Sequence, residues 1–191
     1  MSQFRTILVD PPWPTRKTGK RSVRPNQGTQ LVYPTMSLDA ISDLPVDNLS
    51  GQDSLCFLWS IDRYLAEAHN VLANWGFKKH CTFVWNKPTG VCPFSVQFCN
   101  EFLLLGYKGR LKLAHIGQRT HFAASVTAHS RKPEESYALI ERIGYAPRVE
   151  LFARGQRDGW LCVGNEINGQ DINTALADIS APLKNKEQGD R

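Results

Sequence analysis

The sequence lacks long apolar stretches and lacks the pattern of a cleaved leader. No run of apolar residues approaches the ~20 that a helix needs to cross a bilayer. The opening residues, MSQFRTILVD, have neither the charged nor the apolar region of a signal peptide. We therefore expect a cytoplasmic protein without a membrane-spanning helix.

Cysteine is also scarce, with five residues in a chain of 191, and no Cys-x-x-Cys pair occurs. An odd number without paired spacing fits neither a disulfide framework nor a common zinc site. Cys56, Cys81 and Cys162 lie in apolar runs, where a free thiol packs as a small hydrophobic residue. We expect reduced thiols and no bound metal. No glycine-rich phosphate loop is present either.

What the chain does have is an ordinary globular composition with a mild basic bias. Hydrophobic residues make up 41% and charged residues 21%, and the formal net charge is +5. This length can bury one substantial core, so we expect a single domain over residues 1–179 and a polar tail at 180–191. The basic bias favours a polyanionic partner only weakly.

The apolar segments predict an alternation of strands and helices. Runs that are apolar on both faces indicate buried strands, and these alternate with segments of helical periodicity. This pattern predicts an α/β sheet with helices on both sides. The expected strands are 5–9, 54–61, 80–86, 102–107, 148–153 and 159–163; the expected helices are a short one capped by Ser37, 62–75 and 133–144; residues 109–130 are expected to be loop.

Polar residues follow several of these strands. Asp10 comes directly after the first strand, Asn86 and Lys87 after the third, and residues 154–157 after the strand at 148–153. In α/β sheets ligands bind beyond the carboxyl ends of the strands. We therefore expect these residues to share one site.

The first of these strand ends reads Asp10-Pro11-Pro12-Trp13 and admits two interpretations. It could be a simple turn with a packed tryptophan, because Asp-Pro initiates turns well. It could also present an exocyclic amine for methylation, since a carboxylate and a proline-fixed carbonyl would accept its two N–H groups. The adjacent indole would then stack on a flipped base.

Further motifs follow in order, and together they resemble the MT-A family of adenosine/adenine N6-methyltransferases. The resemblance covers roughly residues 5–167. It implies a Rossmann-like methyltransferase fold that uses S-adenosylmethionine, with a circularly permuted order that places the catalytic motif before the donor-binding strand. The matching segments are DPPW (10–13), YPTMS (33–37), LW (58–59), WNK (85–87), NE (100–101), SRKPE (130–134), ELFAR (150–154) and GNE (164–166).

The resemblance also implies roles for individual residues. The catalytic motif would be Asp10, Pro11, Pro12 and Trp13. Residues implied to bind the donor are Asp10, Asn100, Arg154, Gln156, Arg157, Asn165 and Glu166. Four positions depart from the family's messenger-RNA enzyme: Asn100 replaces a lysine, Gln156-Arg157 replaces His-Asn, and Arg131 replaces a histidine.

Contacts with the substrate are expected from aromatic and basic residues. Lysines and arginines of two loops would meet phosphates, although the same charges could merely be solvated. The candidates are Trp13, Tyr33, Lys17, Lys20, Arg21, Arg24, Lys87, Arg131 and Lys132, and residues 110–132 would form a second basic surface.

The leading hypothesis is methylation of adenine N6 in nucleic acid, with DNA preferred over RNA. A non-catalytic nucleic-acid-binding subunit of the same fold is the main alternative of another class, and an intact DPPW motif argues against it. Methylation of a protein amide nitrogen is disfavoured by Trp13 and by the basic loops. The size of the chain would allow a homodimer or a partner subunit.

Overall fold

A computed structural model describes residues 4–14, 35–91, 96–126 and 131–180. Five predicted substrate contacts lie outside these residues, as does most of the predicted tail. They are Lys17, Lys20, Arg21, Arg24 and Tyr33.

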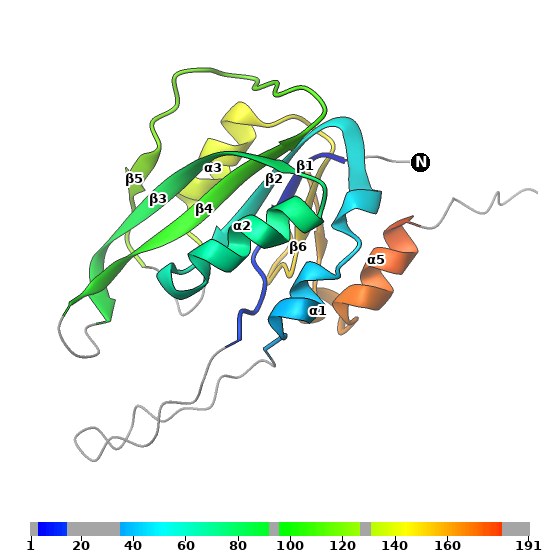
Figure 1. Cartoon of the computed structure of the whole chain (residues 1–191), viewed down its shortest axis with the longest axis horizontal. Coiled ribbons are helices and arrows are strands. Elements are labelled where there is room, and N and C mark those ends of the chain that lie inside the picture. Colours follow the sequence, from blue (N-terminus) through cyan, green and yellow to red (C-terminus); the bar gives the residue numbers. More distant parts are fainter. Residues whose placement is uncertain (1–3, 15–34, 92–95, 127–130, 181–191) are drawn as a thin grey trace, which may run out of the picture.

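The described part of the chain is organised around one seven-stranded sheet, in the order β5-β3-β4-β2-β1-β6-β7 (Figure 1). All strands run parallel except β4, which is antiparallel to both of its neighbours. The strands are β1 (Phe4–Val9), β2 (Ser50–Ser60), β3 (Lys78–Val91), β4 (Phe98–Lys108), β5 (His121–Ala123), β6 (Arg148–Leu151) and β7 (Trp160–Val163).

Strand β1 occupies the middle of the parallel half of the sheet. Its side chains alternate between the two faces, so Ile7 and Val9 join one apolar cluster while Leu8 joins the other. Val9, the last residue of β1, pairs with Leu58 of β2 and Leu151 of β6. This register brings the residues that follow β1 and β6 together at one edge of the sheet.

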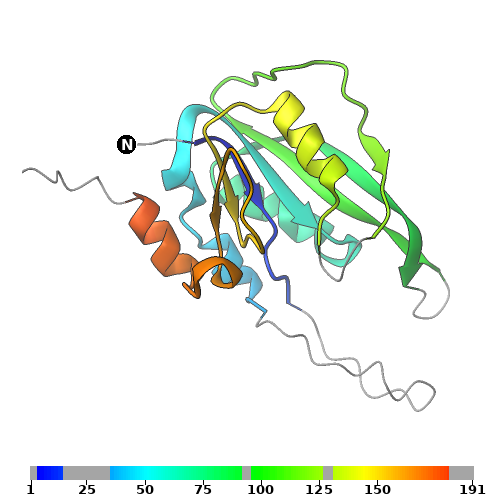
Figure 2. The same cartoon turned by 180° about the vertical axis from the view of Figure 1, so that it is seen from behind.

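Helices cover both faces of the sheet, as Figures 1 and 2 show from opposite sides. On one face lie α1 (Leu38–Ser42), α2 (Leu65–Asn74) and α5 (Ile172–Ser180), whose apolar residues pack with Ile7 and Leu58. On the other lies α3 (Glu134–Ile143), which packs on Leu8 and Trp59. Short helical turns are η1 (Val46–Leu49), η2 (Asp62–Tyr64) and α4 (Asn165–Asn168). The predicted α/β sheet with helices on both sides is confirmed.

Most predicted elements exist; β1, β2, β3 and β4 are longer than expected, whereas β6 and β7 are shorter. The hydroxyl of Ser37 accepts the N–H of Ala40 at 3.1 Å and caps α1 as predicted. The prediction that 109–130 is entirely loop is wrong, because β5 pairs there with the edge of β3. A strand of three residues carries no readable period, so only its neighbour in the sheet defines it. Helix α5 had not been predicted.

Within the described ranges, no helix is long and apolar enough to cross a membrane. The same residues hold no cluster of three or more His, Cys, Asp or Glu side chains that could bind a metal ion. The cysteines that the structure describes are free thiols.

Candidate active site

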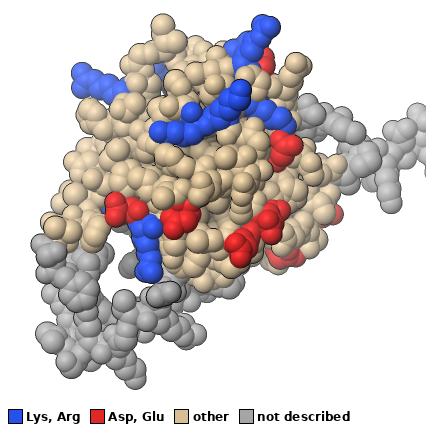
Figure 3. Space-filling view, in the orientation of Figure 1, with Lys and Arg blue, Asp and Glu red and all other residues tan. Residues whose placement is uncertain are grey.

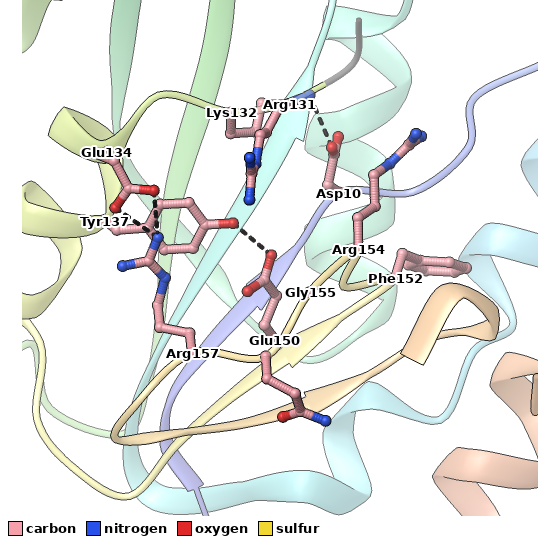
Figure 4. A pocket seen from close by; sticks show the side chains of 11 residues that line it. Asp10, Arg131, Lys132, Glu134, Tyr137, Glu150, Phe152, Arg154, Gly155 and Arg157 are labelled. Atoms are coloured by element: carbon pink, nitrogen blue, oxygen red, sulfur yellow. Dashed lines mark hydrogen bonds and ion pairs between the residues drawn. The ribbon is translucent and has the colours of Figure 1, made fainter. Parts of the chain in front are cut away.

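A cleft opens where β1 and β6 end, beside the first turn of α3 (Figure 4). The cleft is small and open to solvent, with a cavity volume of about 60 Å³. The lining residues are Asp10, Arg131, Lys132, Glu134, Tyr137, Glu150, Phe152, Arg154, Gly155, Gln156 and Arg157.

Asp10 stands at the mouth of this cleft and is paired with Lys132. The distance from Lys132 Nζ to Asp10 Oδ2 is 2.8 Å, and only 12% of the Lys132 side chain is exposed. Burial alone lowers the pKa of Lys132, but the carboxylates of Asp10 and Glu101 outweigh burial and hold it above the ordinary value. The site therefore keeps a charged ammonium against its central carboxylate.

Lys132 belongs to a row of side chains of alternating charge. The row runs from Asp10 through Lys132 and Glu101 to Lys87. The Lys132 ammonium is also 3.3 Å from Glu101 Oε2 on β4, and Glu101 in turn forms an ion pair with Lys87 on β3. Burial raises the pKa of Glu101, yet the two lysines together hold it below its usual range. The predicted substrate residues Lys87 and Lys132 are thus joined through an acid, and Lys87 lies within β3 rather than after its end.

The turn after Asp10 is fixed by backbone hydrogen bonds. The carbonyl of Pro11 accepts the N–H of Trp13 at 2.8 Å, and the carbonyl of Pro12 accepts the N–H of Met36 at 2.9 Å. A carbonyl has two lone pairs, so the Pro11 oxygen keeps capacity for a second donor. This arrangement fits the turn interpretation and leaves the Pro11 carbonyl able to accept an amine.

Trp13 is packed rather than presented to the cleft. It is 7% exposed, its indole N–H donates to the Trp59 carbonyl at 2.9 Å, and its ring stacks on Tyr64 at 5.6 Å between centroids. The packing alternative for this residue is therefore what the structure has. Stacking of the Trp13 ring on a base stays a prediction.

A buried glutamate, Glu150 on β6, points into the cleft (Figure 4). The hydroxyl of Tyr137 on α3 donates to Glu150 Oε1 at 2.7 Å. Burial raises the pKa of Glu150, and the nearby charge of Asp10 raises it further against the opposing hydrogen bond from Tyr137. Burial likewise raises the pKa of Tyr137, which remains a neutral donor.

Arg157 lies against α3, in contact with Glu134 and Tyr137. One of its terminal nitrogens is 2.8 and 2.7 Å from the two carboxylate oxygens of Glu134. Its guanidinium also lies 3.6 Å from the centroid of the Tyr137 ring. The predicted donor residue Arg157 is thus held by groups of the protein itself.

The turn between β6 and β7 carries the other predicted donor residues. Phe152 has φ of 63°, a left-handed conformation that is unusual for a bulky residue and that turns the chain sharply after β6. Gly164 permits this turn to close, because a Cβ there would meet the Ala153 carbonyl at 2.5 Å. Arg154 and Gln156 line the cleft, and Arg154 lies 3.4 Å from Glu166.

Three predicted donor residues, Asn100, Asn165 and Glu166, do not line the cleft. Asn100 is exposed, and it precedes Glu101 on a strand, where neighbouring side chains point to opposite faces. The structure therefore brings Glu101, not Asn100, to the row of charged side chains. Asn165 is exposed at the start of α4, beside Glu166.

The predicted second basic surface is divided. Arg131 and Lys132 line the cleft, whereas Lys112 pairs with Asp53 at 2.6 Å, toward the amino end of β2. On the face seen in Figure 3, most lysine and arginine side chains lie in the upper half and most acidic ones in the lower half. The described residues thus do not support one continuous basic strip over 110–132.

Comparison with known proteins identifies the family of the chain. A family model described as MT-A70 matches residues 4–166, which is most of the chain. The chain belongs to the MT-A70 family. With the sheet described above, this match confirms the predicted Rossmann-like methyltransferase fold, in which the motif after β1 precedes the strand β6.

Relatives of this MT-A70 protein include eukaryotic and bacterial enzymes. It is 32% identical to an N(6)-adenosine-methyltransferase MT-A70-like protein of Arabidopsis thaliana, over 88% of the chain and 24% of that protein. It is 26% identical to the human N(6)-adenosine-methyltransferase catalytic subunit METTL3, over 97% of the chain and 32% of that protein. The Type II methyltransferase M.MunI of Mycoplasma sp is 26% identical, over 89% of the chain and 80% of that protein. The chain therefore spans only a quarter to a third of the length of these eukaryotic relatives.

Sequence analysis did not identify the acidic residues and the tyrosine that line one side of the cleft. Glu134, Tyr137 and Glu150 were not among the candidate residues, although all three line the cleft. A usable signal existed for Glu150, since it is an acid between the apolar residues Val149 and Leu151 of a predicted strand. Tyr137 gave none, because an aromatic residue at helical spacing is typical of ordinary packing.

Proposed function

We propose that this MT-A70 protein transfers a methyl group from S-adenosylmethionine to the N6 amine of adenine in nucleic acid, most readily DNA. The observation that carries the proposal is the position of Asp10. Its carboxylate ends β1 at the mouth of the cleft, next to the rigid Pro11 carbonyl and paired with Lys132.

Asp10 and Pro11 can hold an adenine amine by its two N–H groups. A carboxylate has about four lone-pair positions, so Asp10 can accept from the amine while it remains paired with Lys132. Accepting both N–H groups turns the nitrogen lone pair away from the ring and toward an electrophile. Negative charge at Asp10 also favours the positive charge that develops on the nitrogen during transfer.

The side chains of the cleft fit the chemistry of the donor. When bound, S-adenosylmethionine supplies an electrophilic methyl group on a sulfonium. The carboxylate of Asp10 suits its ammonium, the oxygens of the Glu150 carboxyl group suit its sulfonium, and the cations Arg131 and Lys132 suit its carboxylate. Glu166, beside Arg154, would accept hydrogen bonds from ribose hydroxyls.

DNA is the preferred substrate in this proposal because of how the relatives align. The chain covers 80% of the length of the type II methyltransferase, but no more than about a third of METTL3 or of the Arabidopsis protein. RNA is the second candidate, because these two eukaryotic relatives are named as N(6)-adenosine methyltransferases.

The test is methyl transfer from labelled S-adenosylmethionine to single-stranded DNA, duplex DNA and RNA of matched adenine content, with Asp10→Ala alongside. We expect label on DNA and a loss of at least 10²-fold in the variant, because an essential electrostatic contact is removed. Glu135→Gln, an exposed change in the first turn of α3, is the matched control and should transfer normally. Donor binding without label on any polymer would favour the non-catalytic subunit.

A further inference from the structure

The residues Glu134, Arg157 and Tyr137 form a clasp between α3 and the turn that follows β6. Arg157 lies in that turn, while Glu134 and Tyr137 project from the first turns of α3 (Figure 4). The guanidinium is held on two sides, by the carboxylate at 2.7 and 2.8 Å and by the aromatic face at 3.6 Å. This leaves Arg157 committed to the protein, in a geometry that combines charge pairing with cation–π contact.

The clasp is anchored deeper in the fold through the Tyr137 ring. Trp160 on β7 meets that ring edge-on at 6.1 Å, and the Trp160 N–H donates to Glu141 of α3 at 2.7 Å. The phenolic hydroxyl reaches Glu150 on β6. A single aromatic side chain therefore connects the turn, the helix and two strands of the sheet.

Helix α3 also determines where Lys132 lies. Pro133 is the N-cap of α3, and the buried hydroxyl of Ser136 donates to the Pro133 carbonyl at 2.6 Å. Lys132, the residue before this cap, pairs with Asp10. The start of α3 is thus attached at one point to Asp10 and at another to the turn carrying Arg154 and Gln156.

From these contacts we infer that Arg157 is a positioning residue rather than a ligand of the donor. Through Glu134 and Tyr137 it holds the turn at 154–157 against α3, and so keeps the donor end of the cleft aligned with the Lys132–Asp10 pair. This inference rests on the proposed function, since it assigns the clasp a role in binding S-adenosylmethionine.

The test is a double-mutant cycle on S-adenosylmethionine binding, measured by calorimetry with the full chain and no nucleic acid. Glu134→Gln and Arg157→Gln should each weaken binding about fivefold, as expected for one partly exposed ion pair with an added aromatic contact. The double variant should also lose about fivefold, because both changes remove the same contact. Glu135→Gln, on the neighbouring residue of the same turn, is the matched control and should bind normally.

A direct ligand role for Arg157 predicts a different pattern. Glu134→Gln would then leave binding unchanged or tighter, because it frees Arg157, while Arg157→Gln alone would weaken it. That outcome, or losses that simply multiply in the double variant, would overturn the inference. Thermal unfolding of each variant, well above the temperature of the titration, excludes loss of the fold as the cause. Wild-type protein that binds no donor at all would instead contradict the proposed function.

Discussion

Glu101 and Glu150 lie on either side of the strand that carries Asp10, and their pKa values move in opposite directions. Both side chains are largely buried, and burial raises the pKa of each. Glu101 is in contact with two ammonium groups, which bring its pKa below the usual range. Glu150 accepts a hydrogen bond from a neutral phenol and shares its surroundings with Asp10, so its pKa stays raised.

This difference shows that partners, not depth, set the charge of a buried acid in this site. One side of Asp10 is a fixed chain of ions, while the other can hold a neutral carboxyl group. The two sides therefore offer different chemistry to a ligand: the first holds Asp10 in an ion pair with Lys132, and on the second the pKa of Glu150 is raised.

The largest effect is expected from Lys132→Met, which breaks the ionic side. The change leaves Asp10 and Glu101 as neighbouring carboxylates without the ammonium between them. We expect methyl transfer to fall by about 10²-fold and the free energy of unfolding by about 3 kcal/mol, as is typical when one partner of a largely buried ion pair is removed. Kinetics and denaturant titration would measure both; near-normal transfer would show that Asp10 does not depend on Lys132.

Glu101→Gln should destabilise the protein by about 2 kcal/mol at neutral pH, since hydrogen bonds to a charged group are lost. Because the folded pKa of Glu101 lies below its unfolded value, the carboxylate stabilises the fold above about pH 4 and loses that effect as pH falls through the folded pKa. The difference between wild type and variant should therefore shrink on acidification. A constant difference in urea titrations from neutral pH to about pH 3 would contradict this.

Tyr137→Phe should cost about 1 kcal/mol of stability, the usual value of one hydrogen bond, while the ring keeps its contact with Arg157. The Tyr137 hydroxyl lowers the pKa of Glu150, so its removal should raise that pKa further. Carbon-13 titration of the Glu150 carboxyl by NMR would report the shift. A fall in its pKa would show that the phenol acts differently from what the geometry indicates.

The smallest effect is expected from Glu150→Gln, a gain of about 0.5–1 kcal/mol at neutral pH. A raised folded pKa means that the neutral form of Glu150 is favoured in the fold. Its stabilising contribution is complete below the unfolded pKa of about 4 and is lost as pH rises through the folded pKa. Gln mimics the neutral form at every pH, so the advantage of the variant should disappear in acid. Thermal midpoints of wild type and variant, measured from neutral pH to below about pH 4, provide the measurement.

Local signals in the sequence were sufficient for the framework of this molecule. The apolar run before Asp10, the cap at Ser37 and the helix after Pro133 all follow from residue preferences that act within a few positions. The motif at 10–13 located the mouth of the cleft for the same reason, because a strand end with a carboxylate can be recognised without its neighbours.

Which side chains contact one another in the site could not be predicted from such local signals. Asn100 was named from the family resemblance, which aligns it with a lysine but does not show that the next residue, Glu101, faces Lys87 and Lys132. Arg157 was likewise named from the resemblance, which does not reveal its pairing with Glu134 because that residue comes from a distant segment. The sequence did not show whether Trp13 packs inside the protein or stacks on a base, because its packing partner Tyr64 lies far along the chain.

The single antiparallel strand, β4, ties the chemistry of the site to strand alignment. Glu101 shares a face with Leu103 and Leu105, which pack in the cluster beneath α3. A slip of β4 by one residue would move these leucines to the opposite face, where Leu104 packs, and put Asn100 in the place of Glu101. The alignment of β4 with its neighbours thus also determines whether Glu101 lies between Lys87 and Lys132, and with it the pairing of two positive and two negative side chains that includes Asp10.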